Sequence, residues 1–178
     1  MIKMATKKTS MFTLTERITT ATTGPTFATI DLGSYVDIGD RQAVQVHSCD
    51  YIVQGTTAAE ALTVALGGDS TIDCQLTDLN RGGLIFANDR ALVSSMRLLA
   101  DTSNNSTTKE TDLFPDNFGK GADDGRYVVN DQLYITGRSS ALDSNKAVNI
   151  TVRVNASIVT LSSKDFMAIA IQSTAADN

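Results

Sequence analysis

Residues 147–161, AVNITVRVNASIVTL, alternate apolar and polar side chains over an unusually long stretch. The apolar residues take the even positions from Val148 to Ile158, and only Val159 departs from the alternation. Because successive side chains of a strand point to opposite faces, this pattern predicts a strand with one buried face. Such a strand would be about 35 Å long, well beyond the average, so a wide apolar layer must cover its buried face.

Shorter alternating runs, separated by turn residues, follow one another along most of the chain. Together with the long run they predict about eight strands among the segments 27–32, 35–38, 42–54, 62–66, 72–76, 84–86, 91–99, 126–129 and 132–137. Within 42–54 the alternation changes phase at His47–Ser48, which predicts a β-bulge. Near the C-terminus, Ser162 and Asp165 have capping-box spacing, so a short helix competes with a last strand over Phe166–Ile171.

The chain lacks the amphipathic helices that alternate with strands in α/β folds. Its 178 residues suffice for one domain with a full core. We therefore predict an all-β fold, an antiparallel two-sheet β-sandwich formed by residues 26–178, with a closed barrel as the alternative. Residues 101–125 are predicted to form a long polar loop within it.

Residues 1–25 differ in composition from the rest of the chain. Threonine takes ten of the first thirty positions, and little periodic apolar content precedes Gly24–Pro25. The segment has a net charge of +3 and the remainder −8. Its charged residues are Lys3, Lys7, Lys8, Glu16 and Arg17. We predict a flexible basic arm that contacts nucleic acid or anionic lipid, adds a strand to a neighbour's sheet, or is a solubilising tail.

The predicted loop is polar except for Leu113, Phe114 and Phe118. It also contains oxygen ligands of the kind that Ca²⁺ accepts, namely Asp112, Asp116, Asn117, Asp123 and Asp124. Their spacing does not fit an EF-hand. We interpret them as a solvated acidic loop, with a calcium site between subunits, at Asp112, Asp116, Asp123 and Asp124, as the alternative.

Catalytic groups are scarce. His47 is the only histidine, and the chain has no nucleophile elbow, phosphate-binding loop or dinucleotide-binding glycine motif. Ser48 and Cys49 follow His47, but adjacent residues of a strand point to opposite faces. Cys49 and Cys74 are predicted to be buried reduced thiols, with a disulfide as the alternative. We expect no enzymatic activity and no cofactor.

The order of these features resembles that of small single jelly-roll major capsid proteins of icosahedral viruses. The likeness is one of layout over most of residues 20–173. It includes the basic threonine-rich arm, the paired hairpins, the long polar loop and the closing RYVVNDQLYITGRSS…AVNITVRVNASIVTLSSKDFMAIAIQS. The resemblance implies a single jelly roll of about eight strands with an extended N-terminal arm.

The resemblance also implies a structural virion protein that self-assembles through inter-subunit surfaces and arm exchange. Its partners would be copies of itself in a large homo-oligomer, other virion proteins, and nucleic acid or an internal membrane through the arm. The residues implied for these contacts are Lys3, Lys7, Lys8 and Arg17 in the arm, and Leu113, Phe114 and Phe118 in the loop between subunits. Without a signal-peptide core or a membrane-length apolar run, we expect a protein made soluble in the host cytoplasm and located in the virion.

Two other classes of function stay open. A filament subunit using donor-strand exchange would also need an extended arm. A non-catalytic ligand-binding sandwich, such as a carbohydrate-binding module, needs exposed aromatic platforms, which ten aromatic residues supply poorly. An enzyme of the cupin type needs two or three histidines for its metal, and the chain has one.

Overall fold

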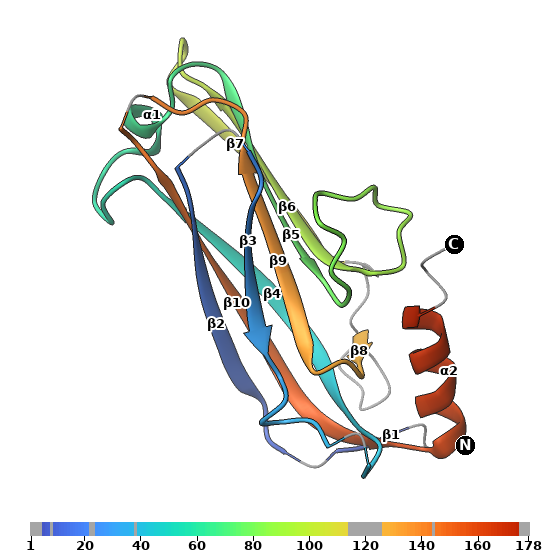
Figure 1. Ribbon diagram of the computed structural model, residues 1–178. Helices are drawn as coiled ribbons and strands as arrows, with labels where there is room; N and C mark the ends of the chain where they lie inside the picture. Colours follow the sequence, from blue (N-terminus) through green and yellow to red (C-terminus); the bar gives the residue numbers. More distant parts are fainter. Residues whose placement is uncertain are drawn as a thin grey trace.

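The computed structural model describes residues 5–7, 9–21, 24–37, 39–113, 126–143 and 145–174. Over these ranges the chain is all-β, with two antiparallel sheets and two helices (Figure 1). The first sheet contains β1 (Ala5–Lys7), β2 (Phe12–Thr20), β4 (Gln42–Gln54), β8 (Arg126–Val128) and β10 (Val148–Leu161). The second contains β3 (Thr26–Asp31), β5 (Ser70–Thr77), β6 (Leu92–Asp101), β7 (Ser106–Leu113) and β9 (Gln132–Ser139). The helices are α1 (Leu62–Ala65) and α2 (Ser163–Thr174).

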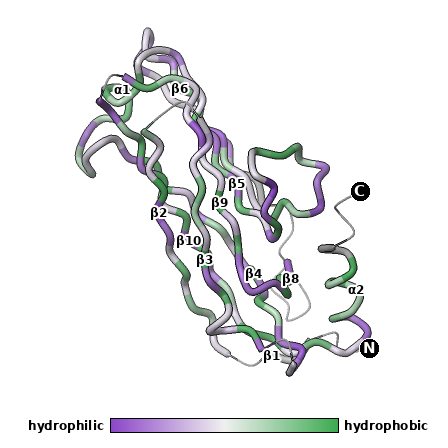
Figure 2. Tube along the Cα trace, viewed as in Figure 1, coloured by the Kyte–Doolittle hydropathy of each residue, from purple (hydrophilic) through white to green (hydrophobic). Residues whose placement is uncertain are grey.

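The long strand β10 is central to the first sheet. It pairs with β4 on one side, and with β2 and then β1 on the other. β8 pairs with the far side of β4. The second sheet has the order β3–β9–β5–β6–β7. Buried side chains from both sheets form one main core, and hydropathy alternates along the strands that enclose it (Figure 2).

The predicted dry face of β10 is confirmed. Val148, Ile150, Val152, Val154 and Ala156 are all fully buried in the main core. The predicted bulge is also confirmed, because Asn155 lies opposite Ser48 while Ala156 lies opposite Val46. His47 is therefore the extra residue of the bulged strand.

A second, smaller cluster explains why Val159 departs from the alternation. Val159 and Leu161 lie on the other side of β10, where they are buried with Ala43 and Val129. α2 covers this cluster with Phe166, Ile169 and Ala170. The end of β10 is thus apolar on both faces because a helix, and not solvent, covers its second face.

The two sheets lie close together at Gly137 on β9. A Cβ atom there would lie 2.1 Å from Cδ1 of Ile18 on β2 and 3.3 Å from Cδ1 of Ile150. Real Cβ contacts are never this short, so the position accepts only glycine unless a buried isoleucine moves. The contact also shows that β2 is packed tightly into the core.

The prediction of an arm outside the core at residues 1–25 is wrong for Phe12–Thr20. This segment is β2, it pairs with β10 from Thr20↔Val148 to Phe12↔Ala156, and its Leu14 and Ile18 belong to the main core. The alternation of apolar and polar residues in β2 is hard to see in the sequence, because its inward-facing even positions include the polar residues Glu16 and Thr20. Glu16 is tolerated there because β2 is an edge strand and its side chain is only half-buried.

Other predicted segments also fold differently. Residues 62–66 contain the single helical turn α1, since a short apolar run does not distinguish a helix from a strand. Residues 35–37 and 84–86 lie outside the strands. The predicted loop 101–125 contains β7, an edge strand whose polar sequence, STTKETDL, carries little apolar alternation.

The C-terminal segment, for which the sequence left a helix and a strand open, is the helix α2. Asp165 N donates a hydrogen bond to Ser162 Oγ at 3.2 Å, which is the N-cap bond of a capping box. The Asp165 carboxylate accepts a second bond, of 2.5 Å, from the same hydroxyl. Within the described ranges, neither helix has the length and hydrophobicity needed to cross a lipid bilayer.

Candidate interaction surfaces

His47, at the bulge of β4, is linked to Ser157 of β10. His47 Nε2 lies 2.8 Å from Ser157 Oγ, which lies 3.5 Å from Gln45 Oε1. Ser157 is fully buried, and the group beyond it in the chain of contacts is the neutral amide of Gln45, whereas a catalytic triad has a carboxylate hydrogen-bonded to the histidine. We therefore interpret this polar chain as a structural link across the bulge.

Cys49 on β4 and Cys74 on β5 are both buried, free thiols, as predicted. Burial raises the pKa of Cys49 from 9.0 to about 11, and burial also raises the pKa of Cys74. Both thiols are therefore protonated at neutral pH. Because the thiolate is the nucleophile and the metal ligand, neither cysteine is suited to catalysis or metal binding.

We expect the Cys49 thiol to make the free energy of unfolding depend on pH in alkaline solution. The thiol ionises near pH 9 when unfolded but near pH 11 when folded. Its stabilising contribution is therefore complete below about pH 9 and is lost as the pH rises towards the folded pKa, a change of about 2–3 kcal/mol. Urea unfolding of the wild type and Cys49→Ala measures this, because the stability difference between them should fall by that amount. An unchanged difference would contradict the burial of the thiol.

The structure describes only part of the residues that were predicted to make assembly contacts. Arg17 is exposed on β2, and Lys7 ends β1 although its side chain is not described. Leu113 ends β7, also without a described side chain. The predicted contact residues that lie outside the described ranges are Lys3, Lys8, Phe114 and Phe118. Arg17 is thus the one member of this set whose side chain is described, and the contacts of the set stay predictions.

Among the described residues, no three His, Cys, Asp or Glu side chains come together as a metal site requires. Asp112 of the calcium alternative lies in β7, and its side chain is not described. The other candidate ligands, Asp116, Asn117, Asp123 and Asp124, lie in 114–125, outside the described ranges. The calcium site therefore stays a prediction.

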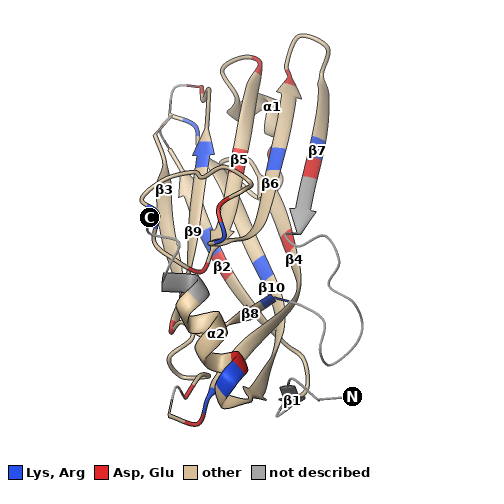
Figure 3. Ribbon diagram, turned by 90° about the vertical axis from the view of Figure 1, so that its right-hand side faces the viewer, with Lys and Arg blue, Asp and Glu red and all other residues tan. Residues whose placement is uncertain are grey.

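The helix α2 carries apolar side chains on two sides. Phe166, Ile169 and Ala170 pack on the sheet, whereas Met167 and Ile171, one turn apart, are each 58% exposed. We call this pair the Met167–Ile171 strip. The helix stands at one side of the sandwich, as the two perpendicular views in Figures 1 and 3 show. Residues 166–171 of α2 are all apolar, and the strip is the part of this run whose large side chains stay mostly exposed, so it is a candidate interface.

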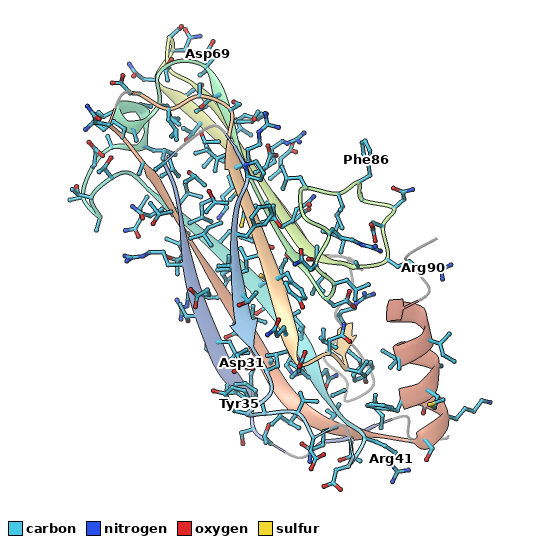
Figure 4. All side chains as sticks on the ribbon, viewed as in Figure 1. Asp31, Tyr35, Arg41, Asp69, Phe86 and Arg90 are labelled. Atoms are coloured by element: carbon cyan, nitrogen blue, oxygen red, sulfur yellow. The ribbon has the colours of Figure 1, made fainter. Side chains whose placement is uncertain are left out.

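The connection from β5 to β6, residues 78–91, folds back over the outer face of the second sheet. Gln75 on β5 holds it through two hydrogen bonds of 2.8 Å: Gln75 Nε2 donates to Ile85 O, and Ile85 N donates to Gln75 Oε1. An ion pair of 3.2 Å between Arg81 and Asp89 braces the loop. Phe86, next to the anchored residue, is 86% exposed and points away from the sandwich (Figure 4). The loop thus holds an exposed aromatic ring in a defined position.

A largely buried ion pair ties the start of this loop to the first sheet. Arg126 Nη2 on β8 donates to Asp78 Oδ2 at 2.8 Å and also donates to the carbonyl of Arg90. Burial raises the pKa of Asp78, and the charge of Arg126 opposes the shift. Removing one partner of such a pair lowers the free energy of unfolding far more than the intact pair raises it, because the other charge is left buried and unpaired. We therefore interpret it as a positioning contact for the loop.

Two hollows of about 500 Å³ each lie beside the loop. The charged hollow is lined by residues 84–87 and by Asp73, Arg97 and Glu110, and the Asp73–Arg97 ion pair in it measures 2.6 Å. The aromatic hollow is lined by residues 27–29 of β3, 134–136 of β9, Asn80 and Gly82, and none of these residues is charged. The two hollows therefore suit ligands of different chemistry.

Sequence analysis did not single out Met167, Ile171, Phe27 or Phe86. A signal existed for Phe27, because Ala28, Ile30 and Leu32 alternate and place it on the opposite, outward face. For α2 the signal was FMAIAI, six apolar residues that leave a helix no polar side there. Phe86 carried no sequence signal, because residues 84–86 also fit a buried strand.

No protein-family model matches this chain, and no curated protein matches its sequence. A sandwich architecture by itself does not specify a function, because one architecture carries many. The exposed surfaces of the described residues must therefore carry the functional conclusion.

Proposed function

We propose that this chain is a structural capsid subunit that self-assembles through inter-subunit surfaces. The observation that carries the proposal is the Met167–Ile171 strip on α2. The helix follows directly on the central strand β10, and its capping box holds its first turn, so the strip has a defined orientation. Identical copies can then repeat the same contact, as a closed assembly requires.

The order of strand pairing supports a single jelly roll as the architecture of this subunit. Four pairs are nested along the chain: β2 with β10, β3 with β9, β4 with β8, and β5 with β6. Successive pairs alternate between the two sheets, as they do when one long hairpin is rolled up. Jelly rolls of eight such strands occur in viral capsid proteins, lectins and cupins. Here β7 extends the second sheet beyond β6.

The pairing of β2 changes the mechanism of assembly from the one implied by the sequence. Exchange of the segment Phe12–Thr20 between copies has no support, because β2 pairs with β10 of its own chain over nine residues. Insertion of a donor strand beside β10 has no support either, because β1 and β2 occupy that side of β10. The proposal therefore places the assembly contact on α2.

We expect the wild-type protein to form large assemblies that the double variant Met167→Gln/Ile171→Gln does not form. Each substitution replaces an apolar side chain of the contact by an amide and weakens the binding free energy by about 1–2 kcal/mol. Together they lower the association constant tenfold or more at every interface. Analytical ultracentrifugation gives the assembly state, and negative-stain microscopy separates closed shells from filaments.

Val64→Gln is the matched control, because Val64 is similarly exposed at 51% but lies on α1, at the other end of the sandwich (Figure 1). This variant should assemble like the wild type. A wild type that stays monomeric at all salt concentrations and pH values, or a double variant that assembles normally, would refute the proposal.

A further inference from the structure

We propose that the aromatic hollow on the outer face of the second sheet binds a neutral saccharide. Its volume of about 500 Å³ lies within the range of about 300–1,000 Å³ typical of small-molecule sites. The residues that carry the proposal are Phe27, Thr29, Asn80, Gly82, Tyr134 and Thr136. The proposed binding does not depend on assembly.

Two aromatic side chains of this hollow come from adjacent strands. In the β3–β9 register Phe27 lies opposite Thr136, and Thr29 lies opposite Tyr134. Phe27 and Tyr134 are therefore diagonal neighbours, a spacing of about 7–8 Å that aromatic side chains bridge. Phe27 is 52% exposed, so much of its ring faces solvent instead of the core. This is the aromatic platform that the composition alone did not lead us to expect.

The loop supplies the polar wall of the hollow. Gly82 N donates to Asn80 Oδ1 at 3.1 Å, which holds Asn80 in place while its amide nitrogen keeps two donors. Gly82 has a φ of +66°, a conformation that favours glycine. Because Gln75 anchors the loop at Ile85, the wall is largely formed before a ligand arrives, which lowers the entropic cost of binding.

None of the residues that line this hollow is charged, which favours neutral ligands over charged ones. A nucleotide or an acidic sugar needs a cationic side chain, and none lines the hollow. A purely apolar ligand would cover the rings but leave the polar groups of Thr29, Asn80 and Tyr134 without partners, which is costly. A neutral saccharide suits both the rings and the polar groups of the hollow. Its C–H face packs on aromatic rings, while its hydroxyl groups bond to hydroxyl and amide groups.

Isothermal titration calorimetry on the full-length protein tests the proposal. The neutral probes are cellohexaose, chitohexaose and mannohexaose, and 3′-sialyllactose is the charged probe. We expect at least one neutral hexaose to bind and sialyllactose not to bind. Phe27→Ala should weaken binding about tenfold. Thr29→Val, which keeps the branched shape but removes the hydroxyl, should weaken it about threefold to tenfold.

Phe86→Ala is the matched control, because it removes an exposed aromatic ring that does not line this hollow. It should bind like the wild type. The proposal is overturned if no neutral probe binds, if Phe27→Ala binds as tightly as the wild type, or if Phe86→Ala is equally weakened. Thermal melts confirm that the variants are folded.

Sedimentation of Phe27→Ala separates this proposal from the proposed assembly function. The variant should assemble like the wild type while losing saccharide affinity. If it instead loses assembly and keeps its affinity, the hollow is a contact between copies and the saccharide proposal fails. A wild type that binds the hexaose but stays monomeric at all salt concentrations and pH values would refute the capsid function and leave the saccharide site supported.

Discussion

Replacing Val152 by aspartate should leave the chain unable to fold. Val152 lies in the middle of β10, fully buried in the main core, with β2 on one side and β4 on the other. A carboxylate at this position would be buried without a cation, at a cost of several kcal/mol. The whole free energy of unfolding of a domain is only about 5–15 kcal/mol, so one such group removes much or all of it.

Arg153→Ala is the control for this substitution, one residue along the same strand. Arg153 points to the opposite face of β10 and is exposed, so its removal should change the free energy of unfolding by only a few tenths of a kcal/mol to about 0.5 kcal/mol. Circular dichroism melts of both variants measure the contrast. Equal effects would contradict the assignment of the two faces of β10.

Deleting residues 1–20 should also prevent stable folding, because it removes β1 and β2. The deletion takes Leu14 and Ile18 out of the core, each worth about 1.5–3 kcal/mol of burial. It also leaves one side of β10 without its hydrogen-bonded partner over nine residues. We expect the truncated protein to unfold at far lower urea concentration than the full chain, or to aggregate through the exposed edge.

A shorter truncation that begins at Met11 is the control. It keeps β2 and removes β1, which pairs with β10 over only three residues. This protein should fold with a small loss of stability, measured by the urea midpoint. If the deletion of residues 1–20 were equally well tolerated, β2 would be an accessory strand and the N-terminal arm would extend to residue 25.

The strands that sequence analysis predicted best are those with one fully apolar face. β10 and β5 alternate over many residues, and β4 alternates on each side of its bulge, so local periodicity was enough. β2 and β7 are edge strands, and an edge tolerates polar residues at inward positions, as at Glu16. Their periodicity is therefore weaker, and the sequence predicts an arm for β2 and a loop for β7.

The candidate surfaces were less predictable, because exposure depends on contacts between distant parts of the chain. Met167 and Phe166 are adjacent apolar residues in one helix, yet one is exposed and the other packs on the sheet. Phe27 and Asn80 line one hollow although 53 positions separate them in the sequence. Residue type alone does not determine which apolar side chain packs against another element and which stays exposed.

The sequence by itself determined the all-β class, the dry face of β10 and the bulge at His47, and it narrowed the C-terminal segment to a capped helix or a last strand. Each of these depends on spacing within a few residues, which the chemistry of neighbouring side chains imposes locally. Only the tertiary structure decided that β2 lies in the core, that α2 leaves Met167 and Ile171 exposed, and that Phe27 and Tyr134 share a hollow. The first and the last arise from the pairing of β2 with β10 and of β3 with β9, more than 100 residues away, and the second from the packing of α2 on Ala43 and Val129. Such pairing is selected by the fit of the whole core, and no local pattern encodes it.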